Sequence, residues 1–277
     1  MRYVLIGPPG NLQRVFPPRP GMAVQAARAS SKQTPIHGLP RVTRSPKAAR
    51  TWSWEQTRLT DDEVAVLQGL EQEVYGPGPY LLYDPVVAKS NMLTPELAAL
   101  GYRGVVPPSV EGGLVPAGPA LLEDGTRLGY SAVGRPFTLP AVPVVAGRAY
   151  TFVAHVSGGD SAEATLNLFW TLTDGTTTLG AHETTPTPAG NSLRRVEVRG
   201  VAPAGAASVT VTGGSDLDAP VWAGLLLVEG VDGPVRWRPG EGMPWVVIEG
   251  GLSQTYQHVG PDGSRRDVSF TLTEVQA

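Results

Sequence analysis

The stretch that decides the fold is Asp267-Val-Ser-Phe-Thr-Leu-Thr-Glu-Val275, close to the end of a chain of 277 residues. Its apolar residues alternate with polar ones, which predicts a β-strand with one buried face. Such a strand needs a partner, because unpaired backbone groups are costly once they leave water. The nearest predicted strands without partners lie before Pro85. We therefore expect the end of the chain to complete a domain that the N-terminal residues began.

The composition favours a mostly β protein with many turns. Glycine and proline number 34 and 27, and only 17% of the residues are charged. The absence of cysteine excludes disulfides and thiolate metal sites. There is no apolar run of about 18 residues, so no membrane-spanning helix is expected. The segment Met1–Ile6 lacks a full signal-peptide core, and we expect synthesis in the cytosol.

One helix start is well marked. Thr60 is the predicted N-cap, Glu63 completes a capping box, and Leu59 and Val64 form a hydrophobic staple. Apolar residues then repeat at helical spacing, at Val64, Leu67, Leu70 and Val74, until Gly76-Pro-Gly-Pro79 ends the helix. Before it, Trp52 and Trp54 share one face of a strand, which places them in a core or at a subunit interface.

From Asn91 onwards, strands recur between turns. They are expected at residues 148–157, 166–172, 193–199, 207–212 and 221–229, the rhythm of an antiparallel sandwich. A linker, 234–244, leads to two further strands, 245–248 and 252–258, and then to the closing strand. We predict a platform domain made of residues 1–88 and 241–277, with a β-sandwich of residues 89–240 inserted in it. The fold class is mainly β: a split barrel or sandwich platform with one short helix, plus the insert.

Two stretches resemble tail proteins of bacteriophages. The segment Arg50-Thr-Trp-Ser-Trp, the capped helix, Tyr75-Gly-Pro-Gly-Pro-Tyr-Leu-Leu-Tyr-Asp-Pro85 and Asn91-Met-Leu-Thr-Pro95 together resemble minor tail proteins of phages that infect actinobacteria. The stretch Arg266–Val275 resembles the closing strand of distal tail proteins. The resemblance implies a split β-barrel related to the tail-tube fold. It also implies a ring, usually hexameric, beneath the tail tube, and a carbohydrate-binding-like insertion.

The middle of the chain resembles carbohydrate-binding modules of the jelly-roll type. The residues that carry this resemblance are Ala146-Gly-Arg-Ala-Tyr-Thr-Phe152, Arg195-Val-Glu-Val198 and Val221-Trp-Ala-Gly-Leu-Leu-Leu-Val-Glu-Gly230. They imply a jelly-roll fold, and fold by itself does not imply sugar binding.

Charge is strongly segregated along the chain. Residues 1–54 contain nine Lys/Arg and no Asp or Glu, so the rest has 13 of the 22 basic residues and all 25 acidic ones, a balance of −12. Residues 28–50 are predicted to be a long irregular basic loop. It is either a solvated charge run or an arm that docks on an acidic neighbour. The candidate inter-subunit contacts are Arg28, Lys32, Arg41, Arg44, Lys47 and Arg50.

Few residues suggest chemistry. The four histidines, His37, His155, His182 and His258, lack ligand spacing, and no metal site or cofactor is expected from them. Asp216 and Asp218 are candidates for a structural Ca²⁺ site. The sequence does not single out any pair of acids as the two catalytic carboxylates of a glycosidase, and it has no Gly-x-Ser-x-Gly nucleophile elbow. We therefore expect no enzyme. For glycan binding the candidates are Trp222 and Tyr130, because sugars need exposed aromatic groups.

The leading interpretation is a structural subunit of the virion. It would form a ring with its own copies, join the tail tube to the tip or hub proteins, and carry a module that contacts polysaccharide on the host cell. It would have neither a membrane nor a specific nucleic acid as partner, since the basic arm lacks interleaved aromatics. The alternative is a secreted or particle-borne carbohydrate-binding protein without a ring role. A glycan-degrading enzyme is the third possibility.

Overall fold

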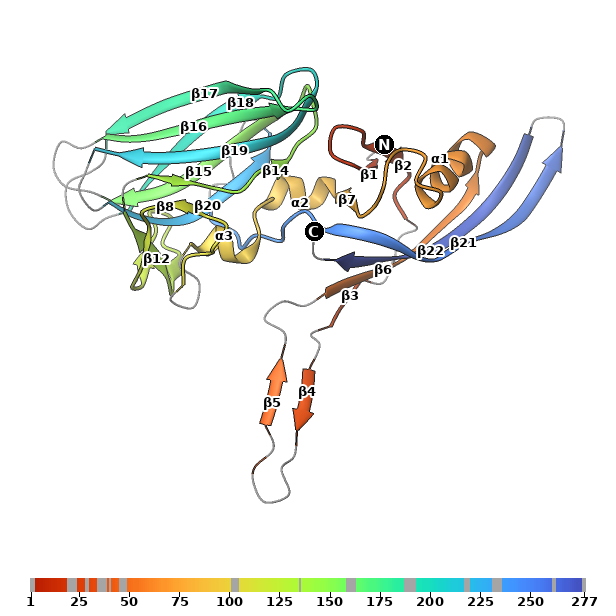
Figure 1. Cartoon of the computed structure of the whole chain (residues 1–277), viewed down its shortest axis with the longest axis horizontal. Helices are drawn as coiled ribbons and strands as arrows, with labels where there is room; N and C mark the ends of the chain where they lie inside the picture. Colours follow the sequence, from red (N-terminus) through yellow and green to blue (C-terminus); the bar gives the residue numbers. More distant parts are fainter. Residues whose placement is uncertain are drawn as a thin grey trace. The chain divides into compact units, whose positions relative to one another are not determined.

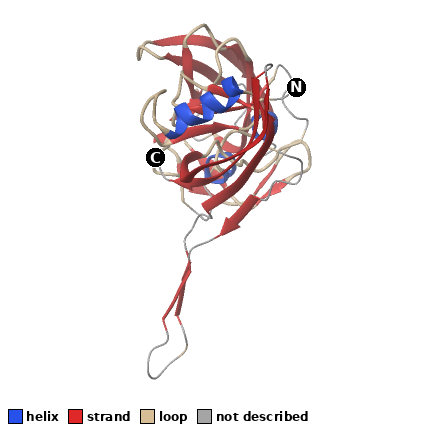
Figure 2. Ribbon diagram, turned by 90° about the vertical axis from the view of Figure 1, so that its right-hand side faces the viewer, coloured by secondary structure: helices blue, strands red, loops and turns tan. Residues whose placement is uncertain are grey.

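The chain divides into two compact units. The computed structural model describes residues 3–18, 24–27, 30–33, 39, 41–44, 49–100, 105–134, 136–157, 163–186, 193–216, 220–230, 236–260 and 263–275. One unit comprises Met1–Leu82 and Pro244–Ala277, and the other Tyr83–Met243. Strands dominate both (Figures 1 and 2), and the mainly β fold class is confirmed. No helix of the described residues is both long and apolar enough to cross a membrane.

The first unit is built on a seven-stranded sheet in the order β2-β1-β7-β21-β22-β6-β3 (Figure 1). Its strands are β1 (Val4–Gly7), β2 (Gln13–Val15), β3 (Val24–Ala27), β6 (Ala49–Leu59), β7 (Tyr80–Tyr83), β21 (Trp245–Gly260) and β22 (Gly263–Val275). The closing strand β22 lies between β21 and β6, and Phe270 is opposite Trp54. The predicted pairing of residues 267–275 with strands before Pro85 is therefore confirmed.

The strand β21 corrects a detail of the prediction. Residues 245–248 and 252–258 were expected as separate strands, but they belong to one strand of 16 residues. The register against β22 shifts between Glu249 and Ser253. Gly250 and Gly251 lie there with φ of 73° and 75°, a left-handed conformation that glycine adopts without steric cost. The two glycines thus make a bulge inside a continuous strand, where the sequence pattern suggested a break.

The helix α1 (Asp61–Glu71) begins as predicted. Thr60 Oγ1 accepts a hydrogen bond from Glu63 N, and Glu63 Oε2 accepts one from Thr60 N at 2.7 Å, so the capping box is confirmed. Val64, Leu67 and Leu70 are buried in the same core cluster as both indoles, Trp52 and Trp54, which makes these tryptophans core residues. Val74 was expected on this face but follows the helix and is 69% exposed.

The basic segment is not an irregular loop over its described residues. β4 (Ser30–Gln33) and β5 (Arg41–Arg44) form a separate antiparallel two-stranded ladder (Figure 1). Lys32 is opposite Val42, and Arg41 is opposite Gln33. The expectation failed because the strands have only four residues each and no clear apolar alternation, so the tertiary ladder, rather than a sequence pattern, defines them.

The second unit is a sandwich of two antiparallel sheets (Figure 1). The five-stranded sheet has the order β18-β15-β20-β12-β9, and the six-stranded sheet has the order β17-β16-β19-β13-β8 with β14 also paired to β19. The strands are β8 (Glu111–Gly112), β9 (Val115–Ala117), β12 (Ser131–Val133), β13 (Phe137–Thr138), β14 (Val142–Pro143), β15 (Ala149–Ser157), β16 (Glu163–Leu172), β17 (Thr177–Pro186), β18 (Arg194–Val201), β19 (Ala206–Ser215) and β20 (Val221–Glu229). A small ladder joins β10 (Ala120–Leu121) to β11 (Arg127–Leu128).

Aromatic rings fill the space between the two sheets. The ring centroids of Tyr150 and Trp170 are 6.0 Å apart, and those of Phe137 and Trp222 are 5.1 Å apart in an edge-to-face arrangement. All four side chains are at most 1% exposed. Trp170 and Tyr150 are therefore core residues of the sandwich.

Two short helices of this unit were not predicted. α2 (Pro85–Ser90) and α3 (Pro95–Ala99) both contact β20, so they help to cover the five-stranded sheet. Each begins with a capping side chain followed by proline, Asp84 before Pro85 and Thr94 before Pro95. At six and five residues they are too short for a helical apolar period to be visible in the sequence.

The segments that enter and leave the sandwich are tied together through Asn91. This side chain is fully buried. Its Nδ2 donates to Leu225 O and Arg238 O, and its Oδ1 accepts from Leu93 N and Leu227 N. The amide therefore makes all four hydrogen bonds that it can make. The stretch predicted as a linker is held within the second unit over its described part.

The capping box makes a testable prediction. Thr60→Ala should lower the free energy of unfolding by about 1 kcal/mol, because one backbone N–H at the start of α1 loses its acceptor. Urea denaturation followed by tryptophan fluorescence measures this change. Thr60→Ser keeps the hydroxyl and is expected to lose much less. Equal stability of the Ala variant and the wild type would show that Thr60 does not cap the helix.

Candidate functional site

The two sheets of the sandwich differ in what covers them. β15 is buried along almost its whole length and β20 along all but its end residues, so neither face of the five-stranded sheet is open there. In β16 burial alternates instead. Leu166, Leu168 and Trp170 are buried, while the residues between them remain partly exposed. The outer face of the six-stranded sheet is thus partly exposed along β16, in contrast to the covered strands β15 and β20.

A row of polar side chains crosses this outer face. Pairing places His182, Asn167, Thr212, Thr138 and Glu111 next to one another on five successive strands. His182 Nδ1 lies 2.6 Å from Asn167 Oδ1, and Asn167 Nδ2 donates to Thr212 Oγ1 at 3.1 Å. An amide oxygen only accepts, so the Nδ1 of His182 is the donor. The hydroxyl of Thr212 keeps its own hydrogen for a further acceptor.

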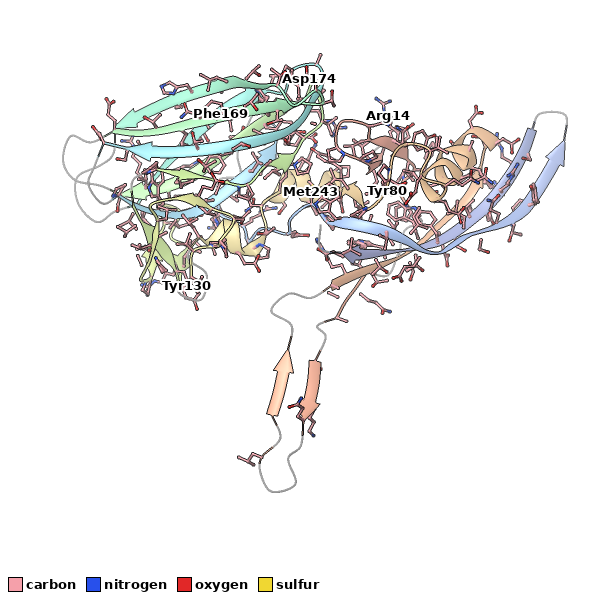
Figure 3. All side chains as sticks on the ribbon, viewed as in Figure 1. Arg14, Tyr80, Tyr130, Phe169, Asp174 and Met243 are labelled. Carbon is pink, nitrogen blue, oxygen red and sulfur yellow. The ribbon has the colours of Figure 1, made fainter. Side chains whose placement is uncertain are left out.

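An apolar row lies beside the polar one. Phe169 is two residues after Asn167 on β16, about 7 Å further along the strand. It is partly exposed, and its neighbours in register are Leu179 and Thr210. Leu179 is 59% exposed. Figure 3 shows Phe169 on this part of the sandwich. An aromatic ring next to fixed hydrogen-bonding groups suits a sugar, whose ring carbons are apolar and whose hydroxyls both donate and accept.

The residues of this face were missed at the level of sequence, although the signal was present. The alternation that put Leu166, Leu168 and Trp170 on one side of a strand also puts Asn167 and Phe169 on the other. What the sequence did not contain was the neighbouring strands. Only the pairing of β16 with β17 and β19 brings His182 and Thr212 to the same row.

The two predicted glycan contacts have different outcomes. Trp222 is fully buried, and its Nε1 donates to Gly134 O at 3.0 Å. A ring enclosed in this way cannot stack on a sugar, so its assignment as a glycan contact was wrong: its strand β20 is central, and the ring points into the core against Phe137. Tyr130 is partly exposed just after β11 (Figure 3), away from the polar row, and stays a prediction.

The candidate inter-subunit residues differ in where they lie and in what they contact. Lys32 lies exposed in β4, and Arg41 and Arg44 belong to β5. Arg28 and Lys47 lie outside the described residues. Arg50 differs from the others, because its Nε donates to the buried Glu274 Oε2 at 2.9 Å. Its charge is compensated inside its own unit, and this removes the reason for assigning it to a contact between subunits.

Asp174 and Asp216, two acids of the second unit, accept hydrogen bonds from nearby backbone N–H groups. Asp174 Oδ1 accepts from Thr176 N, and this bond lowers the pKa of the Asp174 carboxyl. Asp216 Oδ1 accepts from Glu163 N at 2.8 Å. Asp218 lies outside the described residues, so the Ca²⁺ hypothesis is open. Within the described residues no three His, Asp or Glu side chains gather as a metal site would require.

The five-stranded sheet encloses a histidine. His155 is 3% exposed, and its Nδ1 lies 3.1 Å from Gly224 O. Leu122 belongs to a small apolar cluster with Leu128, Leu193 and Ala223. It lies close to the imidazole, because a Cβ atom placed on Gly224 would contact both side chains. Burial lowers the pKa of His155, although Asp124 and Glu123 oppose this shift. The imidazole therefore belongs to the covered sheet and takes no part in the polar row.

No protein-family model and no curated protein matches the sequence. Among solved structures, the enzymatically active domain of tailspike protein 4 of bacteriophage CBA120 aligns at 12% identity and a TM-score of 0.39, over 53% of this chain and 22% of the tailspike chain. TmCBM61, solved with β-1,4-galactotriose, aligns at 13% identity and a TM-score of 0.37, over 51% of this chain and all (100%) of its own. The CBM22-1 xylan-binding domain of Xyn10C from Paenibacillus barcinonensis aligns at 12% identity and a TM-score of 0.36, over 51% of this chain and 97% of that domain's chain. Likenesses of this size carry no conclusion about activity.

The buried His155 predicts acid sensitivity. Its pKa in the folded state lies below the unfolded value of about 6.5, so below that pH the unfolded chain binds a proton that the folded chain does not. The free energy of unfolding should therefore fall as the pH drops from about 7.5 towards about 5, and His155→Gln should remove that part of the decline. Urea titrations at a series of pH values measure it.

The matched control is His182→Gln, which removes an exposed imidazole from the other sheet. It separates the effect of the buried imidazole from that of removing any histidine. If His155→Gln keeps the wild-type dependence on pH, His155 does not couple folding to protonation.

Proposed function

We propose that this protein is a non-enzymatic structural component of a phage tail, and that its inserted sandwich binds a neutral glycan through the outer face of β17, β16 and β19. One observation carries the structural part. The last strand of the chain, β22, completes a sheet that the sandwich interrupts. This is the arrangement implied by the resemblance of Arg266–Val275 to the closing strand of distal tail proteins.

In this proposal the first unit is a tail-tube-like platform. Copies of it form a ring, of six subunits by the same resemblance, that joins the tail tube to the tip or hub proteins. The basic ladder of β4 and β5 supports a role in assembly, because no acidic residue precedes Glu55 to compensate it locally. Compensation must come from elsewhere on the chain or from another molecule.

The glycan part rests on the face described above. Asn167 and Thr212 are oriented by hydrogen bonds before any ligand arrives, which reduces the entropy lost on binding. Phe169 provides the apolar platform. No Lys or Arg stands among the described outward residues of β16 and β19, so the face suits an uncharged sugar better than an anionic one.

A second candidate function uses the same face without the ring. A secreted or particle-borne carbohydrate-binding protein would need the polar row and Phe169, but would not need the first unit to contact other copies. The location of the protein distinguishes the two functions.

The structural role predicts a fixed place in the particle. Antibodies against the chain, with gold labels, should mark the junction between tail tube and tip in electron micrographs of intact phage. Particles assembled without the gene should lack completed tails. If purified particles contain none of this chain, the structural role is wrong. The second function would be favoured if the gold labels were spread along the side of the tail and if particles assembled without the gene had normal tails.

The glycan face predicts the effect of two substitutions. Phe169→Ala should weaken binding about tenfold, because the stacking platform is lost. Asn167→Ala should weaken it by a similar factor, since it removes the group that orients the row. Affinity electrophoresis of the full chain through gels that contain soluble polysaccharide from the host cell wall measures both. The matched control is Val201→Ala, an exposed apolar residue of the other sheet. Unchanged retention of both variants would exclude this face as the site.

A further inference from the structure

In the first unit, the two segments that flank the strand β6 along the chain carry opposite charges. β6 has 11 residues, so its ends lie about 33 Å apart. The basic ladder of β4 and β5 precedes its first residue, Ala49, and carries Lys32, Arg41 and Arg44. The acidic helix α1 follows its last residue, Leu59. Residues 59–82 contain five acids and no Lys or Arg.

Part of the negative charge of α1 is used within the unit. Asp61 Oδ1 pairs with Arg266 Nη2 at 2.7 Å, and hydrogen bonds from Ser264 lower the pKa of this carboxyl. Glu63 belongs to the capping box. The other acids of the segment are exposed, and no ion pair is recorded for them among the described residues; they are Asp62, Glu71 and Glu73. Glu71 and Glu73 accept only backbone hydrogen bonds, from Leu252 N and Gly78 N, which leave their charges without a basic partner there.

The sequence therefore places Lys32, Arg41 and Arg44 before β6, and the exposed Asp62, Glu71 and Glu73 after it. In physiological salt, exposed charges are screened over about 8 Å, which is far less than the length of β6. The basic end and the acidic end of one copy do not neutralise each other through the strand. Two copies placed end to end would bring them into contact.

We propose that the β4–β5 ladder of one copy binds helix α1 of the next copy. The contact is head-to-tail, since different surfaces of the two copies meet, and contacts of this type close into rings or continue as filaments. This inference rests on the proposed ring and assigns its contact surfaces. Single exposed ion pairs are weak, so the contact is collective, and the complementary fields also fix the orientation in which copies meet.

Paired charge reversals test the proposal. The ladder variant carries Lys32→Glu, Arg41→Glu and Arg44→Glu. The helix variant carries Asp62→Lys, Glu71→Lys and Glu73→Lys. Sedimentation velocity of the full chain, at about 50 mM and about 500 mM NaCl, measures self-association. Each variant alone should associate at least tenfold more weakly than the wild type, and the wild type should itself weaken at the higher salt.

The decisive sample is the mixture of the two variants. The acidic ladder of one variant meets the basic helix of the other, and the remaining basic ladder meets the remaining acidic helix. An equimolar mixture should therefore recover association, and so should a single chain with all six reversals. Recovery cannot come from misfolding, because misfolded chains would not restore each other.

Two controls separate charge from folding. The neutral variant Asp62→Asn, Glu71→Gln, Glu73→Gln keeps the shapes of the side chains and should also weaken association. Three reversals on exposed acids of the second unit should leave association unchanged; they are Glu111→Lys, Glu183→Lys and Glu241→Lys. Melting curves establish that each variant folds.

The outcomes also separate this inference from the proposed function. The head-to-tail contact would be overturned if either set of charge reversals left self-association at the wild-type level. It would also be overturned if the mixture of the two variants did not recover association. Both outcomes would leave the tail role intact. A wild type that stays monomeric at low salt and high concentration would overturn the contact as well. The tail role depends on the location of the chain in the particle, which gold labelling tests independently.

Discussion

Antiparallel pairing of β22 with β6 and β21 is the constraint on which the rest of the structure depends. It joins residues that are more than 200 positions apart, such as Arg50 and Glu274, whose ion pair lies at the same edge. The apolar side of this sheet and α1 share one core, including Trp54 stacked on Phe270 at 5.7 Å. Without the last strand, β6 and β21 would each have an open edge, and this core would lose one wall.

The chain must enter and leave the inserted unit without disturbing the strands that pair on either side of it. In the second unit, hydrogen-bonded polar groups hold the segments where the chain enters and leaves. Tyr83 OH donates to Glu229 Oε2 at 2.6 Å, and Arg148 Nη1 donates to the same oxygen. Burial raises the pKa of Tyr83, and raises that of Tyr150 to about 12, so both phenols remain neutral donors. Together with the amide of Asn91, they bind the first and last segments of this unit to its central strands.

In the proposed function, the two units serve two different kinds of recognition. The second unit has a face with no Lys or Arg among the described outward residues of β16 and β19, and a hydrogen bond joins Asn167 to Thr212 there, which suits a ligand selected by shape and hydroxyl position. In the first unit, the segments before and after β6 have opposite charges in the sequence, which suits a partner selected by electrostatic field.

The sequence by itself determined the features that depend on neighbouring residues. The capping box at Thr60, the inward face of β16 and the need of residues 267–275 for a partner all follow from local pattern, because period and capping act over a few residues. Tertiary structure decided the rest. Trp222 could not be assigned to core or surface until its strand was seen to be central. The row that contains Asn167 exists only because pairing sets the register of separate strands, and register is a property of two strands, which no single stretch of sequence contains.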